Sequence, residues 1–344
     1  MKRLFIFTLL AFSALYVSAQ ESILRADLEA RVDYMQEFRG PENYGPGSGF
    51  KGRYILLRVD GQISEGFSYS LRQRINKPTT DLNLFDATDW IQVKYNKGPW
   101  EIAAGKQVVA IGGYEYDTSP IDLFFCSEFW NNLPCFQFGI SGAYTFADGK
   151  DKMTFQIAES PFRRGSLNTE NKALLSYNLM WNGSYDWFSS ICSVNMMEYM
   201  PGKYINYIAL GGLFEFGDFA VQLDLTNRAT SLETLGLEDF TAMGDFSWTP
   251  IDALKIFVRA IYDRNENITG DLCVSPGTDI IRAGAGIEYF PLKNKKNLLK
   301  KLKKKQKNNK KLLIKNETKL KKTEKKLHKT KKKLLQKKLE MLLL

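Results

Sequence analysis

The sequence has 344 residues, with 48 basic and 38 acidic side chains and a net charge of +10. From Lys293 onward it carries 23 lysines and three glutamates, whereas Glu21–Leu292 carries 23 basic and 35 acidic side chains, a net charge of −12. The body is therefore acidic, and nucleic acid is not an expected partner. The single histidine, His328, lies outside the body, which excludes a Ser-His-Asp triad or a His-ligated metal there.

The first residues have the layout of a secretory signal. Lys2 and Arg3 precede the 14-residue run Leu4–Val17, and the small residues Ser18 and Ala19 follow it. We expect residues 1–19 to be removed. An uncleaved membrane anchor is the alternative, but a spanning helix needs about 20 apolar residues. No long apolar run follows, so only the strands of a closed barrel could cross a membrane.

The body, residues 20–292, has the period of two that is typical of strands. Between residues 24 and 34, for example, apolar and charged side chains alternate strictly. Short connections alternate with long ones, as in outer-membrane barrels with periplasmic turns and external loops. We predict an all-β, transmembrane, antiparallel up-and-down β-barrel. The fourteen predicted strands are 24–36, 53–63, 67–75, 89–95, 100–105, 136–146, 153–159, 173–181, 187–197, 205–215, 219–226, 240–248, 254–263 and 280–290.

A secreted β-sandwich is the alternative fold, because its strands alternate as well. Aromatic residues recur near the ends of the predicted strands, where they would suit the two membrane interfaces. This recurrence and the asymmetry of the connections favour the barrel. The aromatic residues concerned are Tyr34, Tyr54, Trp90, Trp100, Tyr144, Trp181, Trp187, Trp248 and Tyr289.

The alternation also assigns the two faces of the predicted barrel. A basic group on the lipid face near the midplane would cost roughly 2–4 kcal/mol, so the charged parity must face the lumen. A wide lumen lined by charges of both signs holds water. The predicted pore-lining residues are Arg58, Arg72, Arg74, Lys94, Glu101, Asp224, Arg259 and Arg282, with Asp60, Asp245 and Glu288 on the same parity.

The longest connection, residues 106–135, is too long for a passive turn. Its apolar cluster would be unusual on a surface loop, so we expect it to fold inward and constrict the pore; a self-packed external loop is the alternative. Cys126 and Cys135 could form a disulfide in an oxidising periplasm or remain free thiols. The charged residues of this predicted constriction loop are Lys106, Glu115, Asp117, Asp122 and Glu128.

Four strings of residues resemble a known family. Residues 85–90, 104–115, 120–123 and 126–132 resemble the phosphate-selective porin O and P-like outer-membrane proteins of Gram-negative, Bacteroidetes-type bacteria. The resemblance spans roughly 24–292 and implies a homotrimeric diffusion porin of about 16 strands. Phosphate-selective members use arginine and lysine at the constriction. The loop here has one lysine and four acids, which predicts weak cation preference or none.

The composition changes after Leu292. Residues 293–344 contain almost only Lys, Leu, Asn, Thr and Glu and no aromatic residue. Because fourteen strands are two short of the number that the resemblance implies, we interpret this tail as a frameshift or altered terminus. Its heptad pattern has one apolar site per repeat, which cannot form a coiled coil. A solvated helix or disorder is expected, and a helix on anionic membranes is the alternative.

These observations predict an outer-membrane diffusion porin for small hydrophilic solutes or ions, without cofactor, metal or catalysis. Outer-membrane lipid is its expected surrounding. The alternative is a surface adhesin or ligand-binding barrel with a plugged lumen. A barrel hydrolase is disfavoured because the body has no histidine to activate a nucleophile.

Overall fold

A computed structural model describes residues 24–36, 38–39, 41–43, 45, 48–76, 84–164, 168, 172–229, 238–266 and 273–289. The predicted signal, 1–19, and the predicted tail, 293–344, lie outside these ranges. The chain divides into two compact units, Met1–Ser247 with Phe257–Ala285 and Trp248–Ile256 with Gly286–Leu344. The candidate site lies entirely in the first unit. In the second unit, Lys255 Nζ lies 3.6 Å from Glu288 Oε1.

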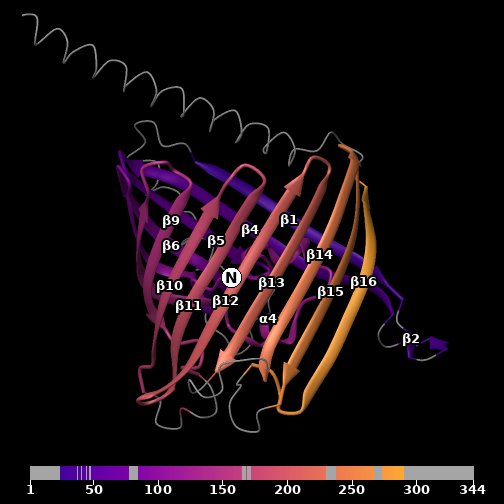
Figure 1. The fold of residues 1–344 in the computed structure, drawn as a ribbon. Coiled ribbons are helices and arrows are strands. Elements are labelled where there is room, and N and C mark those ends of the chain that lie inside the picture. Colours follow the sequence, from indigo (N-terminus) through magenta and orange to yellow (C-terminus); the bar gives the residue numbers. More distant parts are fainter. Residues whose placement is uncertain are drawn as a thin grey trace, which may run out of the picture. The chain divides into compact units, whose positions relative to one another are not determined.

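Fourteen antiparallel strands form one sheet, in which each strand pairs with the next along the chain (Figure 1). Each of the fourteen predicted strands is confirmed, with ends that shift by a few residues. The strands are β1 (Arg25–Met35), β4 (Gly49–Ser64), β5 (Phe67–Arg74), β6 (Thr88–Lys97), β7 (Trp100–Val108), β8 (Phe136–Thr145), β9 (Asp151–Glu159), β10 (Leu175–Ser184), β11 (Phe188–Met200), β12 (Lys203–Phe216), β13 (Phe219–Ala229), β14 (Asp239–Ile251), β15 (Leu254–Asn265) and β16 (Thr278–Tyr289).

The first long connection contains a small hairpin that the sequence pattern did not indicate. It consists of β2 (Phe38–Arg39) and β3 (Glu42–Asn43), which pair only with each other. The two further strands that the resemblance implied are not found within the described residues.

Two of the short turns are built around a glycine with positive φ. Gly98 and Gly217 have φ values of 59° and 63°, a conformation that glycine adopts at little cost. They connect β6 to β7 and β12 to β13 without interrupting the antiparallel pairing. The predicted alternation of short and long connections fails between β11 and β12: residues 198–204 were expected to form a long connection, but both strands extend and only residues 201–202 connect them.

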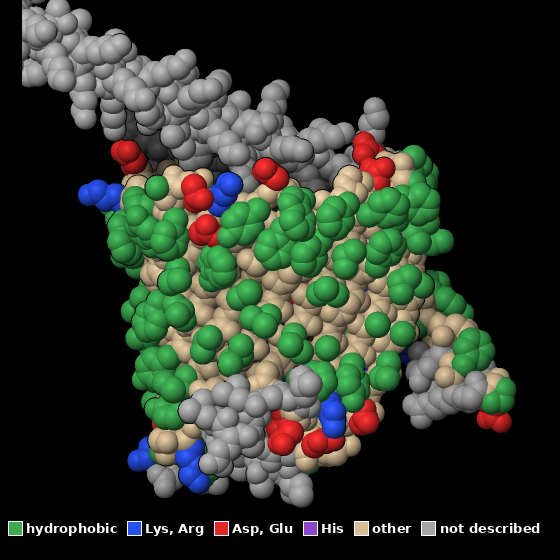
Figure 2. All heavy atoms as spheres, viewed as in Figure 1, with side chains coloured by type: hydrophobic (Ala, Val, Ile, Leu, Met, Phe, Trp, Pro, Cys, Tyr) green, Lys and Arg blue, Asp and Glu red, His purple; other side chains and the backbone are tan. Residues whose placement is uncertain are grey.

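Alternate side chains separate two faces of the sheet. On the outer face, Phe155, Leu179 and Val194 are direct neighbours across β9, β10 and β11, and 50%, 44% and 56% of their surfaces are exposed. Figure 2 shows apolar side chains spread over this face and charged side chains gathered near the strand ends. Exposed apolar residues in this number would be unfavourable in water, but they suit contact with lipid.

Four short helices complete the described structure. They are α2 (Leu84–Ala87), which precedes β6, and α3 (Tyr114–Asp117), η2 (Pro120–Asp122) and α4 (Glu128–Asn132), which lie between β7 and β8. None of the helices in the described ranges reaches the length and apolarity that crossing a membrane requires.

The apolar core lies on the inner face, between the β7–β8 connection and strands β11 and β12. Met197, Ile205, Tyr207 and Ala209 contribute fully buried side chains from these strands. The other buried members are Val109, Ile111, Tyr116, Phe129, Leu133, Phe162, Cys273 and Val274. The β7–β8 connection therefore folds inward and covers part of the inner face with apolar side chains.

Candidate pore and its inward loop

Residues 109–135, here called the inward loop, connect β7 to β8. The expected loop of 106–135 was therefore too long by three residues. Lys106 lies in β7, where its buried side chain donates to the carbonyl of Phe85 in α2 at 2.5 Å. Lys106 therefore precedes the loop in which it was expected, because β7 continues to Val108 and Lys106 pairs with Ile91 and Phe138 in the sheet.

The inward loop begins by crossing the inner face from β9 to β11. The Ala110 N–H donates to Gln156 Oε1 and the Ala110 carbonyl accepts from Asn195 Nδ2, both at 2.8 Å. Two residues later, the Gly112 N–H donates to Ser193 Oγ at 2.8 Å. These bonds satisfy backbone groups that have no strand partner at this point.

A row of neutral polar side chains supports this crossing. Gln156, Asn178 and Asn195 are direct cross-strand neighbours on β9, β10 and β11, and each is at most 2% exposed. Asn178 donates to Gln156 Oε1 at 3.1 Å, and Asn195 donates to Asn178 Oδ1 at 2.8 Å. On the other side, Gln156 donates to the Val108 carbonyl at 2.9 Å. The row is hydrogen-bonded along its length, which burial of amides requires.

Two glycines allow the inward loop to lie directly against the strands. Gly113 has φ 93°, where a side chain would be strained. A Cβ at Gly112 would lie 2.8 Å from the Ile191 carbonyl oxygen on β11. A Cβ at Gly211 on β12 would likewise lie 2.8 Å from Gly113 Cα. The glycine pair in the string 104–115 thus serves close backbone approach.

Asp224 on β13 anchors the first helical turn of the inward loop. Its carboxylate accepts the N–H groups of Tyr114 at 2.9 Å and Glu115 at 2.7 Å. The residue before α3, Gly113, provides no side-chain cap, so Asp224 supplies the acceptor that a helix N-terminus needs. Asp224 is only 9% exposed, so its side chain contacts the loop and little water.

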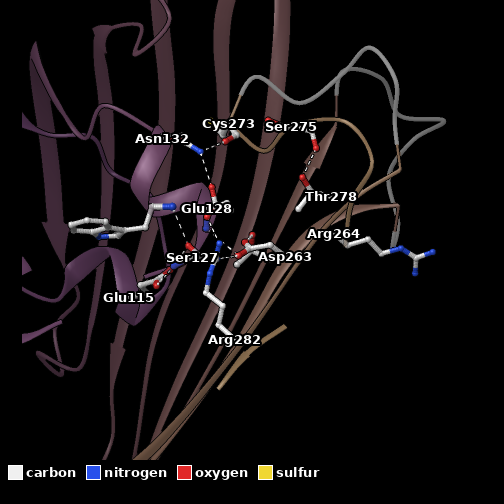
Figure 3. Close-up of polar contacts among 12 residues, drawn as sticks. Glu115, Ser127, Glu128, Asn132, Asp263, Arg264, Cys273, Ser275, Thr278 and Arg282 are labelled. Carbon is white, nitrogen blue, oxygen red and sulfur yellow. Dashed lines mark hydrogen bonds and ion pairs between the residues drawn. The ribbon is translucent and has the colours of Figure 1, made fainter. Parts of the chain in front are cut away.

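Glu115 joins α3 to α4. Its buried carboxylate accepts the Ser127 N–H at 2.9 Å and the Ser127 hydroxyl at 2.6 Å. The Ser127 oxygen accepts the Trp130 N–H at 3.0 Å and so caps α4. Burial raises the pKa of Glu115, and the two bonds from Ser127 oppose that rise. Figure 3 shows the two side chains turned toward each other.

The start of α4 is held by the wall on β15 and β16. Asp263 accepts the Glu128 N–H at 3.0 Å, and Arg282 donates to Asp263 at 2.8 Å and pairs with Glu128 (Figure 3). At the end of α4, Asn132 donates to the Cys273 carbonyl at 2.7 Å. The second half of the loop therefore rests on strands far from β7 in sequence.

A separate set of charged side chains lies on β5 and β6. Arg72 and Arg74 donate to the two oxygens of Asp89 at 2.8 and 3.1 Å. The Arg72 guanidinium lies 3.9 Å from the ring centroid of Trp90. Arg72 pairs with Trp90 and Gln73 with Thr88, so Asp89 is the extra residue of a bulge.

Toward the short turns, the charged side chains keep contact with solvent. Glu101 lies 4.0 Å from Lys94 and 3.0 Å from Lys152, and these three side chains are 29%, 34% and 36% exposed. The Arg58 side chain, paired with Asp60 at 2.7 Å, is 50% exposed. This part of the wall carries charged side chains that are exposed to solvent.

The predicted site residues thus fall into two groups. Arg58, Lys94 and Glu101 are accessible, and Arg74 is partly so. The others expected to line the pore are held in contacts: Arg72 by Asp89, Asp224 and Arg259 by the inward loop, and Arg282 by Asp263 and Glu128.

In the inward loop, Glu115 is buried, Glu128 is paired, and Asp117 and Asp122 are exposed. The surrounding protein raises the pKa of Asp117 through desolvation. The alternation of apolar and charged residues did not indicate the buried amides of Gln107, Gln156, Asn178 and Asn195. The signal in the sequence was an amide side chain at the inward-facing position of each of three neighbouring strands, β9, β10 and β11.

None of the four cysteines, all of which lie within the described residues, forms a disulfide. Of the two alternatives left open for Cys126 and Cys135, the structure therefore has the unpaired state. Burial raises the pKa of Cys126 to about 12 and that of Cys135 to about 11. Both thiols are protonated at neutral pH and have little nucleophilic character.

Comparisons with known proteins agree with this architecture. The family model for phosphate-selective porin O and P matches residues 24–182. No curated protein matches the chain. A trimer form of OmpT, an outer membrane protein of Vibrio cholerae folded in vitro, is similar at TM-score 0.51 and 9% identity, over 78% of this chain and 84% of that chain.

Two other solved structures have lower scores. A second structure of in-vitro folded V. cholerae OmpT has TM-score 0.47 and 8% identity, over 78% and 82% of the two chains. A mutant of the Rh. blastica porin has TM-score 0.36 and 11% identity, over 78% and 99%. The fold comparison therefore rests on the trimer form of OmpT. The chain has the β-barrel fold of outer-membrane porins, and residues 24–182 match the family model for phosphate-selective porin O and P.

Proposed function

We propose that the protein is a diffusion porin for small hydrophilic solutes or ions, and that the inward loop is its constriction. One observation carries the proposal: the inward loop contacts the inner face of β9, β11, β13 and β15, whereas Arg58, Lys94 and Glu101 on β4, β6 and β7 stay accessible. A passage beside this part of the wall would be bounded by the loop on one side and by Arg58, Lys94 and Glu101 on the other.

Selection in such a passage arises from its width and from the field of its charges. The accessible wall contributes cations and anions in pairs, such as Lys94 with Glu101. The loop contributes the exposed carboxylates of Asp117 and Asp122. We therefore expect weak cation preference or none. Catalysis is not part of the proposal.

A homotrimer in outer-membrane lipid is the proposed assembly. The similar V. cholerae structure is described as a trimer form, and the apolar outer face could contact either lipid or further copies of the chain. Crosslinking of the protein in outer-membrane fractions would test this, with a trimer band as the expected result.

Planar-bilayer recording of the refolded full chain tests the porin function. Discrete conductance steps in potassium chloride are expected, with a small reversal potential in a salt gradient. Strong anion selectivity together with block by inorganic phosphate would contradict the expected selectivity and assign phosphate as the solute. Insertion without conductance would contradict the porin function itself.

A barrel with a plugged lumen is the second candidate. The observation that favours it is the apolar core between the inward loop and β11–β12, which also includes Phe162, Cys273 and Val274 from two other long connections. A plug of this kind would suit an adhesin or a ligand-binding barrel. The same recording distinguishes the two functions, because a plugged barrel inserts into the bilayer and remains silent.

A further inference from the structure

Within the described residues, the two end strands of the sheet pair with a neighbour on one side only. In hydrogen-bonding order the sheet runs from β1 to β16. Val32 on β1 and Ile281 on β16 are 70% and 76% exposed, compared with 44% for Leu179 and 49% for Leu210 in the middle of the sheet. Unpaired strand edges are unfavourable in a membrane, so these strands need another means of being held.

On the β1 side, the Arg31 side chain binds the inward loop. Its guanidinium donates to the Ile121 carbonyl at 3.0 Å and the Leu123 carbonyl at 2.6 Å, and it lies 4.8 Å from the ring centroid of Phe124. Asp33 holds the same guanidinium at 2.7 Å. Arg31 thus contacts three residues of one loop segment, Ile121, Leu123 and Phe124. Several contacts from one guanidinium fix the orientation of this segment relative to β1, which a single ion pair on the surface would not do.

On the other side, the same loop segment rests on β15 and β16. The Phe124 ring stacks on Phe257 with a centroid separation of 5.0 Å. Arg259 donates to the Phe125 carbonyl at 3.1 Å. A Cβ at Gly284 of β16 would lie 2.8 Å from Cε1 of Phe125, so the ring packs directly on the β16 backbone.

We propose that Ile121–Glu128 is a strap that holds β1 to β15 and β16, and that Arg31, Arg259 and Arg282 are its positioning residues. Each of these arginines is bound to a loop acceptor and to a wall carboxylate: Asp33, Asp245 and Asp263, respectively. Their side chains are 13%, 8% and 27% exposed, compared with 50% for Arg58 and 34% for Lys94, so solutes would sense them less.

Hydrogen exchange of the refolded full chain, followed by mass spectrometry, tests the strap without requiring solute passage. For Arg31→Gln, amides of β1 and β16 are expected to exchange about ten-fold faster, whereas those of β9–β11 keep their rates. The matched control is Lys94→Gln, which also removes an inner-wall cation. It should leave β1 and β16 unchanged but alter the reversal potential.

Gly284→Ala provides a second test that leaves every charge in place. The added methyl group would meet the Phe125 ring, so exchange in β16 should again rise about ten-fold. If Arg31→Gln does not yield folded barrel, Gly284→Ala decides the question alone. Exchange of β1 and β16 within about two-fold of the unmodified chain, in a folded variant of either kind, would overturn the strap.

Discussion

The inner wall has two regions with different chemistry. Beneath the inward loop, on β9–β11, the inward side chains are neutral: Gln156, Asn178 and Asn195 in one row. At the accessible positions of β4 and β6 they are charged, as with Arg58 and Lys94. The difference follows from exposure to solvent: burying an ion costs several kcal/mol, whereas a buried amide that is hydrogen-bonded is tolerated.

Charges that do lie beneath the inward loop have structural partners. Asp224 accepts two backbone N–H groups, and Asp263 accepts one N–H, a Thr241 hydroxyl and Arg282. By contrast, the partly exposed pair of Lys94 and Glu101 contributes at most about 1 kcal/mol to stability. The covered region thus holds the loop in position, whereas under the proposed function the accessible charges would set the field that solutes meet.

The largest effect should follow from breaking the neutral row. Asn195→Leu removes the donor to the Ala110 carbonyl and to Asn178, and it leaves both acceptors buried. We expect a loss of about 3 kcal/mol of unfolding free energy. Urea unfolding in detergent micelles, followed by tryptophan fluorescence, measures it. Gln137→Ala is the control: its bond to the Pro134 carbonyl is exposed, and the loss should be about 0.5 kcal/mol or less.

A smaller effect is expected from the anchor of α3. Asp224→Ala removes the acceptor for two N–H groups and should cost about 2 kcal/mol. Because the first helical turn of the inward loop is then released, single-channel current should also become noisier. Asp224→Asn keeps one acceptor oxygen and should retain a quieter current. Equal noise in both variants would mean that the carboxylate does not position the loop.

The strands could be predicted from the sequence because lipid on one side and polar contacts on the other impose a period of two. Ile205–Leu210 departs from this alternation, since Ile205, Tyr207 and Ala209 face inward beneath the loop. A strand that is apolar on both faces indicates that both faces are covered, but it does not indicate which segment covers the inner one.

The sequence also predicted that the side chains of Asp224, Arg259 and Arg282 point to the inner face. Their burial was not predicted, because it depends on the path of a loop distant in sequence.

Neutralising the accessible loop acids tests the field of the accessible charges. Asp117→Asn with Asp122→Asn should shift selectivity toward anions, since charges within a Debye length of about 8–10 Å act on a passing ion. The reversal potential in a salt gradient measures the shift. Asp186→Asn with Asp218→Asn, a double neutralisation in two short turns, is the control and should produce a smaller change. Equal shifts would place the loop outside the passage.

The smallest effect is the pH dependence that Asp117 should impart. Desolvation raises its pKa, so on acidification from pH 7 this carboxylate gains a proton before an ordinary exposed aspartate does, and the cation preference of the pore weakens. The sign is fixed, because protonation removes a negative charge beside the passage. The effect should be reversible and absent from Asp117→Asn.

Glu115 also has a raised pKa, but its carboxylate is buried against Ser127, so its protonation should alter the loop and not the field that solutes meet. A selectivity change that persists in Asp117→Asn would therefore point to Glu115 and to movement of the loop.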